Sequence, residues 1–160
     1  MIFKKNKQTT DTTPQVIEVK LNKDYKFMYD NFLISSQHDL YLVLQGHGGQ
    51  VDALKFNFRV YKFGYPNDEA MGTHPLAKFG LGSYGLFQVL NSPWTKEICE
   101  GNRIHPRHHD SMFENLKHYV ARFKDVTLDI LCNNMEEMQL PKEKVIELVN
   151  QELEFLTTDD

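Results

Sequence analysis

Three of the seven histidines stand together between residues 103 and 110, beside two arginines and an aspartate. Imidazole binds zinc, copper, iron and nickel, and a neighbouring carboxylate can orient such a ligand. The guanidinium groups can instead hold a carboxylate or a phosphate with two parallel hydrogen bonds. We therefore assign the following candidate binding residues to this segment: Arg103, His105, Arg107, His108, His109 and Asp110.

The spacing inside this histidine-rich segment does not identify a metal. Pro106 interrupts a regular helical pair of histidines, and no second ligand pair with diagnostic spacing occurs in the sequence. An exposed polar loop is the simplest interpretation, followed by a site for an anion or nucleotide, and then by a metal site. We accordingly assign no metal and no cofactor from the sequence, and keep a small anionic ligand as an alternative.

A second group of candidates lies in the glycine-rich segment 64–83, where Asp68 and Glu69 precede His74. Two carboxylates and an imidazole can supply general acid–base chemistry. The same residues are also ordinary turn material, because Asp68 can cap a short helix. The turn-and-cap interpretation is the simpler one, and the acid–base site stays an alternative.

The single tryptophan, Trp94, is a further candidate. Ser92 and Pro93 directly before it are typical of a helix start, because a serine can cap the first turn and proline suits its first position. A tryptophan beside a loop can anchor a partner, and it can equally pack in the core.

Complete catalytic motifs are missing from the sequence. The glycines at 46–49 lack the lysine and hydroxyl residue of a phosphate-binding loop, and a hairpin turn explains them. Residues 82–85 do not have the spacing of a nucleophile elbow. The two cysteines, Cys99 and Cys132, match no zinc or redox pattern, which favours a reduced protein without disulfides.

The elements that must position these candidates are mainly strands. Alternation of apolar and polar residues predicts strands at 38–45 and 51–63, joined by the glycine-rich turn. A second hairpin is predicted from 117–123 and 126–133. Shorter strands are expected at 16–21 and 83–90.

Three helices are predicted. The first spans residues 23–34, where aromatic and aliphatic residues recur at loosely helical spacing, and the second runs from Pro93 to Gly101. The third opens at Pro141 and carries an apolar stripe. The stripe consists of Val145, Leu148, Val149, Leu153 and Leu156.

Long alternation of strands and helices is absent, which argues against a doubly wound parallel sheet. We predict one α+β domain over residues 15–156, in which an antiparallel sheet is packed on one face by a few helices, including the amphipathic C-terminal helix. Residues 1–14 are predicted to be a flexible tail, and residues 157–160 a frayed end.

Charge is unevenly distributed along the 160 residues. Residues 125–160 carry ten acidic and two basic side chains, whereas the whole chain has a net charge of −4. Such an acidic end argues against a general nucleic-acid binder. It can form a solvated helix face or complement a basic protein partner. The residues expected to contact such a partner are Glu143, Glu147 and Glu154.

Neither a signal-peptide pattern nor an apolar run of membrane-spanning length occurs, so we expect a soluble cytoplasmic protein. The sequence predicts a small non-catalytic binding protein, inhibitor- or immunity-like, that meets a protein partner or a second copy of itself. The alternative is a binding protein for a small anion or nucleotide, or a histidine-dependent hydrolase with or without a metal. Both alternatives require the loops around His74 and His105–Asp110 to converge at one edge of the sheet.

Overall fold

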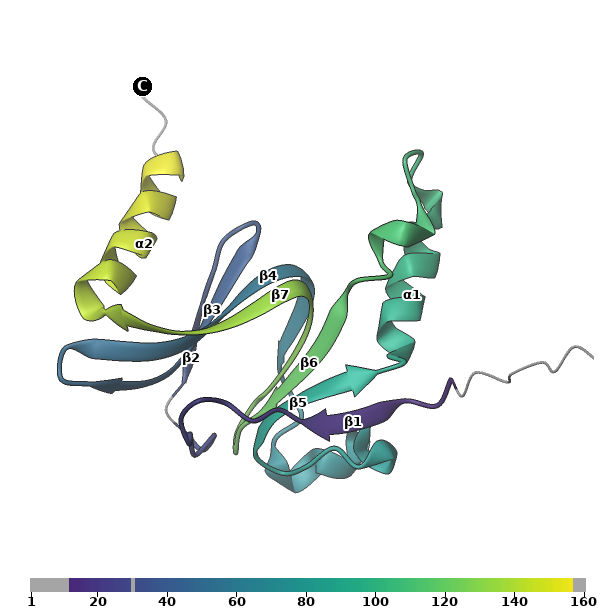
Figure 1. Ribbon diagram of the computed structural model, residues 1–160, viewed down its shortest axis with the longest axis horizontal. Coiled ribbons are helices and arrows are strands. Elements are labelled where there is room, and N and C mark those ends of the chain that lie inside the picture. Colours follow the sequence, from purple (N-terminus) through teal and green to yellow (C-terminus); the bar gives the residue numbers. More distant parts are fainter. Residues whose placement is uncertain (1–11, 30, 157–160) are drawn as a thin grey trace, which may run out of the picture.

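The computed structural model describes residues 12–29 and 31–156 and confirms the α+β class. Residues 1–11 of the predicted flexible tail and the predicted frayed end 157–160 lie outside the described residues. Seven antiparallel strands form one sheet in the order β1-β5-β6-β7-β4-β3-β2 (Figure 1). The strands are β1 (Gln15–Glu18), β2 (Phe32–Ser35), β3 (Asp39–His47), β4 (Gln50–Gly64), β5 (Gly85–Leu90), β6 (Lys117–Arg122) and β7 (Thr127–Pro141).

Both predicted hairpins are present. Gly48 and Gly49, with φ of 57° and 81°, make the two-residue turn between β3 and β4, because glycine adopts this left-handed backbone without a steric penalty. The second strand of the other hairpin is longer than predicted, since β7 continues to Pro141. Its outer half, residues 134–141, is half polar and lacks the strict alternation that identifies a strand. It is held by pairing with β4, from Asn57↔Asn134 to Gln50↔Pro141.

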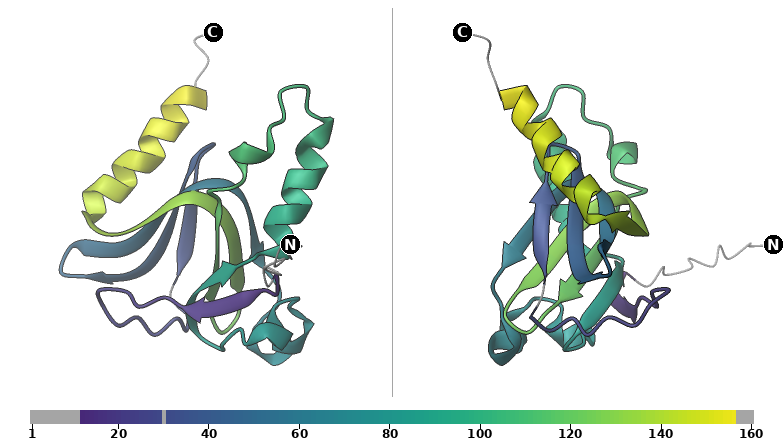
Figure 2. Two further views of the ribbon diagram at one scale, coloured as in Figure 1. Left: turned by 45° about the vertical axis from the view of Figure 1, so that its right-hand side comes forward. Right: turned by 90° about the vertical axis from the view of Figure 1, so that its left-hand side faces the viewer.

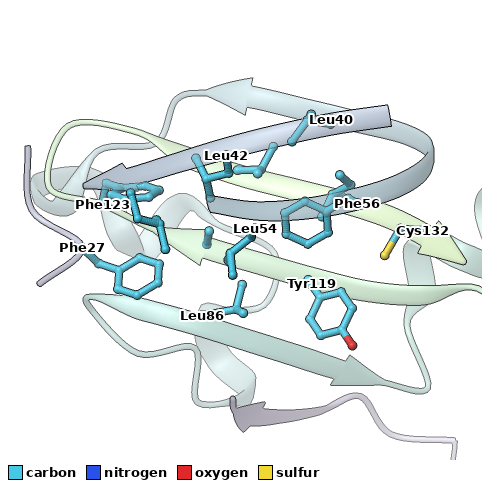
Figure 3. Close-up of a cluster of buried hydrophobic side chains, with 13 residues drawn as sticks. Phe27, Leu40, Leu42, Leu54, Phe56, Leu86, Tyr119, Phe123 and Cys132 are labelled. Carbon is cyan, nitrogen blue, oxygen red and sulfur yellow. The ribbon is translucent and has the colours of Figure 1, made fainter. Parts of the chain in front are cut away.

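The sheet is strongly curved. Two register shifts, at Asn57/Phe58 and Phe58/Val60, interrupt the pairing of β4 with β7. Bulges of this kind bend the strand that contains them. The two long strands consequently arch over, as the views in Figure 2 show. The main core fills the concave side, where buried side chains from β3 to β7 converge (Figure 3).

The helix predicted at residues 23–34 is wrong. Phe27 has a φ of 49°, which no right-handed helix allows, and β2 begins at Phe32. Aromatic residues of this segment pack into the core instead, where the ring of Phe27 lies 5.2 Å from that of Phe123. Burial against the sheet therefore overrides a weak helical periodicity.

The opposite face of β5 and β6 is covered by residues 65–83, and the helix α1 (Pro93–Gly101) reaches it through Trp94, whose ring lies 5.3 Å from that of His118. Val120 of β6 packs here against Leu76 and Leu81, whereas its neighbours along the strand point into the main core. The covering segment contains the short 3₁₀ helices η1 (Asp68–Thr73) and η2 (Ala77–Phe79).

The cap of η1 differs from the prediction by one residue. Asn67, not Asp68, precedes the helix, and its side-chain oxygen accepts a hydrogen bond from the Ala70 N–H at 3.1 Å. Helix α1 is capped by Ser92, begins at Pro93 and ends at Gly101, as predicted. It is followed by two more 3₁₀ helices, η3 (Asn102–Ile104) and η4 (Asp110–Met112).

The C-terminal helix α2 (Lys142–Leu156) follows Pro141 as predicted, and it stands away from the sheet (Figures 1 and 2). Val145 in its first turn packs against Val43, Val51 and Ala53. None of its fifteen residues, all of them described, is buried. Within residues 12–29 and 31–156, no helix has both the length and the apolar character needed to cross a membrane.

Candidate functional site

Two histidines share one aspartate beneath the covering segment. His118 of β6 and Asp129 of β7 lie on adjacent strands, and His74 follows η1. The Nε2 atom of His118 lies 3.1 Å from Asp129 Oδ1, and the Nε2 atom of His74 lies 3.0 Å from Asp129 Oδ2. Both histidines are buried. The shared carboxylate therefore ties the covering segment to the sheet.

The hydrogen bonds fix the proton position on His74. The Leu76 N–H donates to His74 Nδ1 at 3.1 Å, so this nitrogen is an acceptor and the ring proton resides on Nε2, which donates to Asp129. His118 is arranged differently, because its Nδ1 faces the Ser92 hydroxyl at 2.8 Å. A hydroxyl can donate or accept, so Ser92 can satisfy His118 Nδ1 in either tautomer, but the Asp129 carboxylate only accepts and therefore keeps the His118 proton on Nε2.

Asp129 is held as a carboxylate although it is largely buried. Burial alone raises its pKa, but the hydrogen bonds from His118 and His74 outweigh burial and lower the pKa to about 2. The network continues to α1, since the Ser92 oxygen also accepts the Thr95 N–H at 3.2 Å. One ionised carboxylate thus connects the covering segment, the sheet and the start of α1.

His74, His118 and Asp129 line a cavity of about 390 Å³, and we call this polar part of its lining the floor. The other lining residues are largely apolar, and the Nζ atom of Lys62 lies 4.4 Å from the centre of the Trp94 ring. A cation above an indole face is a favourable arrangement. The lining residues include Lys62, Pro66, His74, Leu76, Trp94, Glu97, His118 and Asp129. A pocket of this size suits a small molecule.

Ser92, His118 and Asp129 lie in the order of a serine-protease triad, but the serine is not placed as a nucleophile. The described residues that line the cavity do not include Ser92, whose oxygen is occupied by capping α1. Each ring nitrogen of His74 and His118 already has a partner. The group that the floor can offer to a ligand is therefore the Asp129 carboxylate, which retains free lone pairs.

The other residues predicted around His74 are placed elsewhere. Asp68 accepts a hydrogen bond from the Tyr84 hydroxyl at 2.7 Å, and Glu69 is exposed. Trp94, by contrast, joins His74 at the cavity. His118 and Asp129 were missed from the sequence. Each is a polar residue inside an apolar strand of one predicted hairpin, and that signal could have identified them as a buried pair.

The histidine-rich segment forms a separate cluster at the far end of α1. Asp110 Oδ1 accepts from His108 Nε2 at 2.6 Å and from the Cys99 thiol at 3.6 Å, while Arg103 donates to Oδ2 at 3.2 Å. The hydrogen bonds from His108 and then Arg103 lower the pKa of Asp110. His108 also contacts Asn102, where Nδ1 lies 2.9 Å from the amide nitrogen.

The remaining residues of this segment stay at the surface. His105 Nδ1 accepts from the Arg107 N–H within a turn, and His109 is exposed. The cluster lies near Asn102 and the pocket near Trp94, which are separated by about 12 Å of helix at 1.5 Å per residue. The two predicted loops thus make their contacts at opposite ends of α1.

A third surface is the outer side of α2. Ile146, Val149, Leu153 and Leu156 follow one another at intervals of three, four and three residues, and their exposed fractions lie between 40% and 77%. The predicted interface residues Glu143, Glu147 and Glu154 are exposed on the same helix. Glu147 accepts hydrogen bonds from Lys144 and Gln151.

No protein-family model matches this chain, and neither the curated proteins nor the solved structures contain a significant match.

Proposed function

We propose that this chain is a protein-binding module that holds its partner with the exposed face of α2. The observation that carries the proposal is the apolar row Ile146, Val149, Leu153 and Leu156, which we call the α2 seam. Its spacing is that of the contact positions of paired helices. An apolar row of this kind left in water is typical of an interaction surface.

The seam is unusual because α2 gains little from its own sheet. An isolated helix of 15 residues is marginally stable in water, and most helices are stabilised by burying their apolar face. In α2 the contact with the sheet is made by Val145 in the first turn. The seam residues are 40–77% exposed, so their burial on a partner would contribute roughly 1–2 kcal/mol each before the cost of association.

The charges of α2 indicate the chemistry of the partner. Four glutamates, at 143, 147, 152 and 154, outnumber the two lysines at 142 and 144. An amphipathic segment with Lys or Arg beside its apolar face complements this helix, and charge complementarity speeds association and orients the partner. We therefore infer a basic, helical protein partner.

Photo-crosslinking tests this proposal in cells that express the full chain. A photoreactive residue at position 153 is expected to capture a protein with a basic amphipathic segment. The matched control is the same residue at position 104, where Ile104 is 92% exposed on η3. Joint reversal of Glu143, Glu147 and Glu154 to lysine is expected to remove the crosslink.

The outcomes separate the alternatives. A crosslinked product at twice 18.7 kDa would replace the partner with a second copy of the chain. Capture at position 153 that does not exceed the control at position 104 would overturn the proposal.

The pocket favours a second function, the binding of a small molecule. Its floor presents the Asp129 carboxylate, and the Trp94 ring in its lining already contacts the Lys62 ammonium group. These groups suit a flat apolar ligand that carries an ammonium or another N–H donor. The histidines position the carboxylate and are not the acceptors themselves.

Calorimetry with phenethylamine, ethylbenzene and 3-phenylpropionate distinguishes these preferences. The amine is expected to bind most tightly and the carboxylate most weakly, and Asp129→Asn is expected to remove the difference between amine and hydrocarbon. Tighter binding of the carboxylate, or no binding of any of the three, would contradict the second function.

We further propose the cytoplasm as the location of this protein. Cys99 on α1 and Cys132 in the core are both free thiols, which suits a reducing compartment.

A further inference from the structure

We propose that Cys99, His108 and Asp110 form a zinc-binding site at the C-terminal end of α1. The side-chain donors Sγ of Cys99, Nε2 of His108 and Oδ1 of Asp110 come from the helix and from the histidine-rich loop. The ligand atoms of the three residues all lie within 4.8 Å of one another. Thiolate, imidazole and carboxylate are the three protein ligand types that zinc takes.

The distances are close to those of a tetrahedral site. Bonds of 2.0–2.3 Å to a common ion place two ligand atoms roughly 3.3–3.8 Å apart. The sulfur of Cys99 already lies 3.6 Å from Asp110 Oδ1. His108 Nε2 lies 2.6 Å from the same oxygen, so these two residues must separate by about 1 Å to admit the ion. Asp110 is exposed at the first residue of η4, so its side chain can make this movement at little cost.

Each of the two loop ligands has an outer partner on the side away from the proposed ion. The Asn102 amide lies 2.9 Å from His108 Nδ1, and Arg103 donates to Asp110 Oδ2 at 3.2 Å. Zinc-binding histidines commonly donate their other ring N–H to such a group, and rotation of the Asn102 amide by 180° turns its oxygen toward His108. The atom of each ligand that would point away from the ion therefore already has a hydrogen-bond partner.

The ring of His108 is also fixed in its plane. Phe113 stacks on it with 5.6 Å between ring centres and an angle of 28°. His108 Nε2 is therefore pointed toward Asp110 and Cys99 by a buried phenylalanine on one face and by Asn102 at the opposite atom. This support holds Nε2 in the orientation that the proposed site requires.

Three protein ligands leave one of the four zinc positions for water or for a donor from another molecule. Catalytic zinc sites keep such a position, whereas structural sites fill all four with protein ligands. The ion would also fasten the loop of residues 102–112 to α1. The site is independent of the α2 seam, so either proposal can fail without the other.

Cobalt binding to the full chain, freed of metal with a chelator and carrying no histidine tag, tests the site. Co²⁺ is expected to give the absorption of a tetrahedral ion together with a thiolate-to-metal band, and Zn²⁺ is expected to displace it in a 1:1 ratio. Cys99→Ser is expected to remove the thiolate band. His108→Ala and Asp110→Asn are each expected to weaken binding at least tenfold, and Asn102→Ala about tenfold, because outer partners contribute 10–100-fold.

His105→Ala and His109→Ala are the matched controls, since they remove the same side chain from the same loop outside the cluster. They are expected to leave the Co²⁺ spectrum and the affinity for Zn²⁺ unchanged. Loss of binding in these controls, or its persistence in Cys99→Ser and His108→Ala, would overturn the proposal. Absence of a thiolate band in the unaltered chain would overturn it as well. Circular dichroism of each metal-free variant separates loss of ligands from loss of fold.

Discussion

Helix α1 is joined to the sheet by a network of buried polar groups, whereas α2 packs against the sheet through its first turn. The first begins at a serine that caps it, buries Trp94, and connects through His118 to a carboxylate in the sheet. The second contacts the sheet through Val145 in its first turn and leaves its seam in water. Both helices are amphipathic in sequence. Apolar periodicity therefore identifies a helix but does not say whether the protein itself or another molecule covers it.

The largest effect is expected at the carboxylate that secures the α1 side. Asp129→Ala leaves the Nε2–H groups of His74 and His118 buried without acceptors, and we expect it to lower the free energy of unfolding by about 3–5 kcal/mol. Urea denaturation measures this change.

Asp129→Asn is the informative control for that prediction. Its amide oxygen can accept from His74, while its NH₂ group can donate to His118 once the His118 proton moves to the Ser92 side. We expect the asparagine variant to lose less than half as much stability as the alanine variant. Equal losses would show that charge, and not hydrogen-bond matching, holds the network together.

The same network predicts how acid weakens the fold. Because folding lowers the pKa of Asp129 from 3.8 to about 2, its carboxylate adds stability above pH 3.8. This contribution, about 2 kcal/mol at 1.36 kcal/mol per pKa unit, is lost as the pH falls from 3.8 through 2. The difference in unfolding free energy between the unaltered chain and Asp129→Asn should shrink by this amount over that interval. A constant difference would contradict the assignment.

The sequence predicted the parts of this fold in which local pattern and tertiary burial agree. The β3–β4 hairpin combines clear alternation with Gly48 and Gly49 at its turn. The helix predicted at 23–34 is wrong because Phe27 packs into a core that is formed by strands distant in the sequence. The outer half of β7 was not predicted because its pairing with β4 does not require alternation of apolar and polar residues.

The candidate sites were predicted in part, for a related reason. His74, Trp94 and the histidine-rich loop stood out by residue type. Their partners did not, because His118 and Asp129 meet through the register of β6 and β7, in which Val120 faces Asp129. Cys99 meets His108 only after a helix and a loop turn back on each other. Such pairs require three-dimensional positions that spacing does not supply.

On the face of the sheet that carries the Asp129 network, one buried polar side chain, an arginine, has no hydrogen-bond partner in the part of the chain that the structure describes. Arg122 of β6 is fully buried, and its guanidinium nitrogens have no hydrogen-bond partner among the described residues. Burial lowers its pKa, while Asp129 and Asp68 attract its charge through space. Replacing an unpartnered buried charge with an apolar side chain of similar length is often stabilising.

We therefore expect Arg122→Met to raise the free energy of unfolding by about 1–2 kcal/mol, as measured by urea denaturation. Arg122→Lys keeps the charge and is the matched control, for which no gain is expected. A loss of stability in the methionine variant would contradict this prediction, because it would show that the buried guanidinium stabilises the fold.

The smallest change in stability is expected at the α2 seam, and it is the one that decides what α2 is for. Leu153→Ser removes an exposed apolar side chain, so the free energy of unfolding should change by no more than about 0.5 kcal/mol. Leu76→Ser removes a leucine that is 2% exposed beside the pocket and should cost about 2–5 kcal/mol. If α2 serves a partner, the Leu153→Ser variant, with the photoreactive residue moved to position 149 of the same seam, loses the crosslinked product without losing stability. A loss comparable to that of Leu76→Ser would instead mean that the seam is covered by this chain itself, and the contrast between the two helices would disappear.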